Sequence, residues 1–108
     1  MISKLRWNKA WRGLGTPPAQ DDDAIVREYA RLVSEIEGVR GVWALYIGPK
    51  LALATLVEDD KGVERQVYRT ELAIYDQWPK AHVRFEVYPD EESLREFVQG
   101  ATPVLIEA

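Results

Sequence analysis

The segment from Gly41 to Glu58, GVWALYIGPKLALATLVE, constrains the fold of this 108-residue chain more than any other. It is typical of two apolar strands that fold back at Gly48-Pro49-Lys50, where glycine and proline favour a turn. Strands buried on both faces are apolar at nearly every position, whereas half-exposed strands alternate apolar and polar residues. The segment therefore predicts a β-hairpin inside a sheet, with both of its faces covered.

The length of the hairpin loop decides which residues of the two strands share a face, because successive side chains point to opposite faces. We expect a three-residue loop, Gly48 to Lys50, which would place Ile47 opposite Leu51. The core face would then hold the bulky residues of both strands: Trp43, Leu45, Ile47, Leu51, Leu53, Thr55 and Val57. The other face would be apolar but shallow, formed by Val42, Ala44, Tyr46, Ala52, Ala54 and Leu56.

Length and composition indicate one folded domain. The chain has the usual size of a single domain, and 46% hydrophobic with 30% charged residues is ordinary for a globular protein. No apolar run approaches the roughly 20 residues that span a bilayer, and four cations interrupt the N-terminus where a signal peptide would be apolar. We therefore expect a cytoplasmic location. The absence of cysteine excludes disulfides, thiolate metal sites and a cysteine nucleophile.

The charge is distributed unevenly along the chain. Residues 1–20 carry four cations and no acid, whereas the remainder carries ten cations and eighteen acids, a net charge of −8. Because an acidic body repels phosphate, nucleic-acid binding is expected to be weak unless the basic segment acts alone. We divide the chain into a basic arm, residues 1–20, and a single domain, residues 21–108.

The arm contains two tryptophans, Trp7 and Trp11, and its pattern supports two structures. Trp7, Trp11 and Leu14 have the spacing of one helical face, whereas residues 2–7 alternate as in a strand. The tryptophans either pack on the core of the protein itself or dock on a partner. Contact of residues 1–15 with RNA or a membrane surface is a further hypothesis. Residues 16–20 contain two prolines and are expected to be an irregular spacer.

Two longer helices are expected on either side of the hairpin. Residues 21–37 combine three aspartates at the start with an apolar stripe, and Gly38 is a suitable residue to end that helix. We interpret the aspartates as capping residues, since acids gather at helix starts for electrostatic reasons alone. After the hairpin, residues 63–67 alternate as in a strand, but the longer pattern favours a helix over residues 65–78.

The C-terminal third contains two further strands and a short helix. Residues 81–88 alternate cleanly, which predicts a strand, and Asp90 is placed to cap a helix over residues 90–99. Residues 103–106 form an apolar segment of strand length that we expect to pair with a sheet edge, of this chain or a partner. The core-facing residues of the strand at 81–88 would be Val83, Phe85 and Val87.

This order of elements predicts an α+β two-layer sandwich, with helices on one face of a mainly antiparallel sheet of three or four strands. If residues 2–7 are a strand, the first six elements form the β-α-β-β-α-β order of a ferredoxin-like fold. Without that strand the order is a truncated α-β-β-α-β-α. In that truncated version a right-handed crossover brings the strand at 81–88 parallel to the second hairpin strand, residues 50–58. In both versions the helices cover one face of the sheet, and the other face lacks a helix.

An apolar sheet face without a cover is larger than a monomer normally exposes to water. We therefore expect a non-enzymatic interaction protein that forms a homodimer through this face, through the arm, or through both. Alternatively, the helix at 90–99 and the C-terminal segment cover the face themselves, which removes the need for a partner. The expected interface residues are Trp7, Trp11, Val42, Ala44, Ala52, Ala54 and Leu56.

Polar residues on the strand at 81–88 suggest a second hypothesis, a small-molecule binder or a small dimeric enzyme. Arg84 would hold an anionic ligand and His82 would exchange a proton beside Glu86, with Tyr46 and Tyr88 nearby. A solvated strand face with an Arg–Glu pair explains the same residues. Nucleotide-binding, P-loop and serine-hydrolase motifs are absent, and a single histidine disfavours a histidine metal site. We therefore predict no catalytic residue, metal or cofactor.

Overall fold

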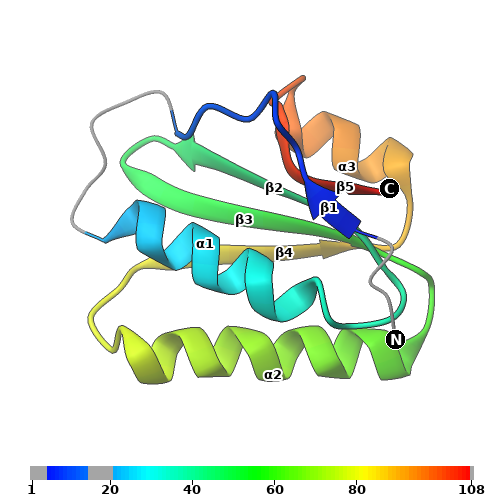
Figure 1. Ribbon diagram of the computed structural model, residues 1–108, viewed down its shortest axis with the longest axis horizontal. Helices are drawn as coiled ribbons and strands as arrows, with labels where there is room; N and C mark the ends of the chain where they lie inside the picture. The colour runs from blue at the N-terminus through cyan, green and yellow to red at the C-terminus, as the bar shows by residue number, and fades with distance from the viewer. Residues whose placement is uncertain (1–4, 15–20, 108) are drawn as a thin grey trace.

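The computed structural model describes residues 5–14 and 21–107. Within them the strands form one mixed sheet in the order β1-β5-β2-β3-β4 (Figure 1). Strands β3 and β4 are parallel, and the other neighbouring pairs are antiparallel. The elements in chain order are β1 (Leu5–Trp7), α1 (Asp22–Val33), β2 (Val39–Ile47), β3 (Lys50–Val57), α2 (Lys61–Gln77), β4 (Val83–Tyr88), α3 (Glu91–Val98) and β5 (Pro103–Glu107).

The helices lie on both faces of the sheet. Helices α1 and α2 pack side by side over one face, whereas Leu94 and Val98 of α3 pack against Ala54 and Leu56 on the other. The predicted α+β class is therefore confirmed, and the prediction that every helix covers the same face is wrong. The sheet is mixed and five-stranded, and β1 lies at its edge beside β5, so the ferredoxin-like arrangement is not confirmed.

The hairpin closes with a two-residue loop rather than the predicted three. Ile47 lies opposite Lys50 and Tyr46 opposite Leu51, and Gly48 has a positive φ of 59°. Because a slip of one residue turns every side chain of a strand to the other face, the predicted faces of β2 are exchanged. The core face combines Val42, Ala44 and Tyr46 with Leu51, Leu53, Thr55 and Val57, whereas Trp43, Leu45 and Ile47 lie on the face of α3.

A buried polar pair joins α1 to the centre of the sheet. The hydroxyl oxygens of Tyr29 and Thr55 lie 2.6 Å apart, and both side chains are fully buried. The Tyr29 ring also lies 5.3 Å from the ring of Phe85 on β4, centroid to centroid. Burial raises the pKa of Tyr29 well above its usual range, so its hydroxyl remains a neutral hydrogen-bonding group.

Capping side chains set the starts of two helices. The Asp60 carboxylate accepts hydrogen bonds from the backbone of Gly62 and Val63, so α2 begins at Lys61 and the alternative of a strand over 63–67 is wrong. Asp90 caps α3 as predicted, accepting from the Ser93 backbone at 2.8 Å. Hydrogen bonds from the backbone and side chain of Ser93 to the Asp90 carboxylate lower the pKa of Asp90.

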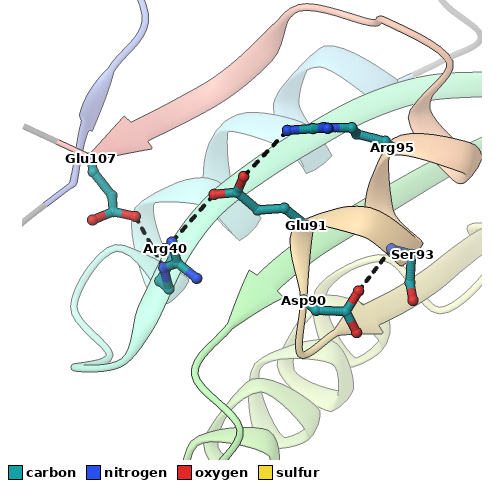
Figure 2. A network of polar contacts seen from close by, with 6 residues as sticks. All are labelled: Arg40, Asp90, Glu91, Ser93, Arg95 and Glu107. Carbon is teal, nitrogen blue, oxygen red and sulfur yellow. Dashed lines mark hydrogen bonds and ion pairs between the residues drawn. The ribbon is translucent and has the colours of Figure 1, made fainter.

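An exposed ionic network connects α3 to the sheet (Figure 2). Arg40 on β2 donates to Glu107 on β5 at 3.1 Å and to Glu91 on α3 at 3.3 Å. Glu91 also lies 3.7 Å from Arg95. Because these groups are solvated, each pair contributes little to stability, and the apolar contacts of Leu94 and Val98 hold α3 in place.

Candidate functional site

The sheet face that was predicted to be open is partly covered within a single chain. Helix α3 covers part of it, as in the alternative interpretation, and the prediction of an uncovered face is wrong. Of the predicted interface residues, Trp11 packs against the core and Trp7 on β1 is 46% exposed. The other five are buried, with exposed fractions of 0% for Val42, 6% for Ala44, 0% for Ala52, 0% for Ala54 and 3% for Leu56.

The predicted polar pocket is divided between two places. The Tyr46 hydroxyl points to the helix side of the sheet and donates to Asp22 at 2.5 Å. On the other face, Arg84 donates to Glu86 at 2.6 Å and lies 5.4 Å from the centre of the Phe97 ring. This is the Arg–Glu pair that the simpler interpretation expected, and it leaves Arg84 engaged within the protein.

Two other predicted ligand residues belong to these separate places. The Tyr88 ring lies 5.6 Å from the Phe97 ring, and burial followed by the charge of Glu86 raises the pKa of Tyr88. His82 is exposed and lies away from this aromatic contact, beside a cavity at the opposite end of β4. The structure therefore does not assemble the five predicted residues into one site.

The cavity beside His82 lies where three connections meet: the start of α1, the β2–β3 turn and the link from α2 to β4, all on the left of Figure 1. We call it the Asp22 cavity. Its volume is about 570 Å³. The residues that line it are Asp21, Asp22, Ile25, Pro49, Leu51, Gln77, Trp78, Pro79, Lys80, Ala81 and His82.

A second candidate surface is an exposed apolar stripe on α2, formed by Tyr68, Leu72 and Tyr75 and called the α2 stripe below. Their exposed fractions are 51%, 64% and 38%, and their spacing places them along one side of the helix. Tyr75 donates a hydrogen bond of 2.8 Å to the backbone carbonyl of Val83 and meets Phe85 edge to face. The stripe therefore borders β4, the strand at one edge of the sheet.

Glu71 lies one turn before Tyr75 and is partly buried. Its Oε2 atom is buried and has no hydrogen-bond partner among the described residues. Burial, followed by the negative charge of Glu86, raises the pKa of Glu71 from 4.5 to about 7. The surroundings of this carboxyl group, beside the α2 stripe, therefore disfavour its negatively charged form.

No protein-family model, curated protein or solved structure matches the chain. The comparisons therefore do not indicate what the Asp22 cavity or the α2 stripe binds. Within residues 5–14 and 21–107, no three histidine or acidic side chains gather closely enough to hold a metal ion. None of the described helices combines the length and apolar character needed to cross a membrane. Contact of the basic arm with RNA or a membrane surface stays a prediction.

Proposed function

We propose that this protein is a non-enzymatic interaction protein that forms a homodimer through the α2 stripe and the outer edge of β4. The observation that carries the proposal is the exposure of Tyr68, Leu72 and Tyr75 in one row. Each exposes more than a third of its surface, and such rows on soluble proteins mark interaction sites. The sequence predicted a homodimer through the open sheet face or the arm, and we now propose the α2 stripe and the edge of β4 as its interface.

The charge pattern of α2 favours a second copy of the chain as the occupant. The first nine residues of α2 carry three cations, Lys61, Arg65 and Arg69, and one acid, a net charge of +2. The last eight carry two acidic residues, Glu71 and Asp76, and no cation; because the pKa of Glu71 is raised to about 7, their net charge lies between −1 and −2 at neutral pH. This order opposes the helix dipole, which favours acids at the start and cations at the end. In an antiparallel pair of α2 helices each positive half lies along the negative half of the other.

The same arrangement brings two strand edges together. Stable dimers bury about 800 Å² of each subunit, so the interface would extend from the α2 stripe onto β4. A two-fold axis between the subunits makes both the helix contact and the strand contact self-complementary. Exposed edge strands commonly pair with another strand, and β4 has a strand on one side among the described residues.

Replacing Leu72 by arginine should convert the dimer into a monomer. A charge at the centre of the α2 stripe removes the most exposed apolar contact and places two like charges near the two-fold axis. We expect the dissociation constant to rise roughly hundredfold, as for a central interface residue. Sedimentation equilibrium of the full chain over a range of concentrations measures it.

Ile47→Arg is the matched control, because Ile47 is an exposed apolar residue at the hairpin, outside the stripe. This variant should dimerise like the wild type. Arg65→Glu should weaken the dimer, and adding Asp76→Arg to it should restore association if the helices are antiparallel. A wild-type protein that stays monomeric up to millimolar concentration, or equal effects of Leu72→Arg and Ile47→Arg, would refute the proposal.

A further inference from the structure

Asp22 places a buried carboxylate in the Asp22 cavity, and no cation of the described residues pairs with it. Asp22 is 8% exposed, and its Oδ2 atom accepts a hydrogen bond from the Tyr46 hydroxyl. None of the ion pairs between described residues includes Asp22. Burying an unpaired charge is costly, so the group favours a positive partner from outside.

The neighbouring aspartates differ from Asp22 in this respect. Asp23 forms an ion pair of 2.9 Å with Arg27 on the surface of α1, and Asp21 is exposed. The Tyr46 hydroxyl holds the Oδ2 atom of Asp22 in place, and Asp22 lines the cavity. The carboxylate is therefore held ready to receive a hydrogen-bond donor within the cavity.

The remaining walls of the cavity are apolar and aromatic. Ile25 and Leu51, each 2% exposed, contribute to the wall with Ala81, and Trp78 adds an indole ring that is partly buried. Lys80 and His82 are exposed and therefore lie at the rim. A volume of about 570 Å³ is within the range of cavities that hold small organic molecules. The cavity combines one deep anionic group with an apolar body and a rim that carries Lys80 and His82 as well as the acidic Asp21.

We propose that the Asp22 cavity binds a small organic ammonium compound with an aromatic or branched aliphatic body. The ammonium group would donate to the Asp22 carboxylate, and the apolar body would pack between Ile25, Leu51 and Trp78. An indole ring also attracts cations to its face. If the ligand carries a carboxylate as well, as an amino acid does, Lys80 and His82 at the rim would receive it. This site is separate from the α2 stripe and does not depend on self-association.

Titration of the full chain with phenethylammonium, followed by two-dimensional amide NMR, tests the proposal. We expect saturable shifts for Ile25, Leu51 and Ala81, and at least tenfold weaker binding in the Asp22→Asn variant. The anionic analogue 3-phenylpropionate, which has a similar body without the ammonium group, should not shift these signals. A parallel titration with phenylalanine distinguishes the two kinds of ligand. Tighter binding than phenethylammonium indicates an amino acid, and weaker binding indicates a simple amine.

Two variants separate a role of the charge from a change in fold. Asp23→Asn removes a neighbouring acid outside the cavity and should bind like the wild type. Ala81→Leu keeps every charge but fills part of the cavity, and it should weaken binding at least tenfold while the remaining spectrum stays folded. Equal binding of the ammonium compound and 3-phenylpropionate, no saturable shift with any ammonium compound, or unchanged affinity in Asp22→Asn would overturn the proposal.

Discussion

Replacing Gly38 by alanine is expected to lower the free energy of unfolding by about 3 kcal/mol. Gly38 joins α1 to β2 with a φ of 100°, a conformation that costs an L-residue about 1–2 kcal/mol. An added Cβ would also lie 2.6 Å from Cγ2 of Val63 in the first turn of α2, and such overpacking costs about 1–3 kcal/mol. Urea unfolding at a fixed protein concentration measures the sum of the two effects.

Gly48→Ala is the control for the backbone cost alone. Gly48 also has a positive φ, 59°, but no atom lies within 4 Å of the position of an added Cβ. We expect that variant to lose about 1 kcal/mol. Shortening Val63 to alanine should recover part of the loss in Gly38→Ala, as a double-mutant cycle would measure. If Gly38→Ala costs no more than Gly48→Ala, α2 does not approach the end of α1 as closely as the structure indicates.

The sequence was sufficient to predict the hairpin, but it was not sufficient for the strand order of the sheet or for the register of the hairpin. An apolar run and a Gly-Pro turn establish that two strands fold back on one another, whereas Gly-Pro-Lys is compatible with loops of two or three residues. That single residue decides whether Tyr46 or Leu45 points to α1. The predicted interface followed from the wrong choice, because it combined residues of both faces into one.

Helix placement was uncertain for a related reason. The apolar side of α3, with Leu94, Phe97 and Val98, fits either face of a sheet equally well, and the connections before and after it decide which face it covers. Similarly, α2 has apolar residues around much of its circumference. Its pattern predicts a helix, but packing against the sheet determines that Val67 and Ile74 are buried while Leu72 is exposed.

The Asp22 cavity could not be predicted because it depends on both the register of the hairpin and the placement of the helices. Three consecutive aspartates at a helix start predict capping, yet the side chain of the N-cap residue Asp21 forms no capping hydrogen bond, and nothing in the order of the three distinguishes the middle one. Asp22 differs from its neighbours because Tyr46 reaches it, and Tyr46 does so because the hairpin loop has two residues. His82 was selected from its strand pattern and does border this cavity, whereas Arg84, Glu86 and Tyr88, which were predicted to lie beside it, belong to the group around Phe97.

Glu71→Gln is expected to stabilise the protein at pH 8 and to have little effect at pH 4. Burial, followed by the negative charge of Glu86 on β4, raises the pKa of Glu71 from 4.5 to about 7 in the folded state. The folded protein therefore retains a proton that the unfolded chain loses between these values. Wild-type stability should fall as the pH rises from about 4.5 to 7 and stay lower above that range.

The expected gain of Glu71→Gln at pH 8 is about 1–2 kcal/mol. The full pKa shift corresponds to about 3 kcal/mol, but Glu71 is partly exposed and solvent screening reduces the effect. Urea unfolding at one fixed, low protein concentration keeps self-association out of the comparison. Glu64→Gln, two turns earlier on the same side of α2, is the matched control and should show no such pH dependence. If Glu71→Gln and the wild type lose stability in parallel as the pH rises, the Glu71 carboxyl ionises in the folded protein without the cost that its buried oxygen implies.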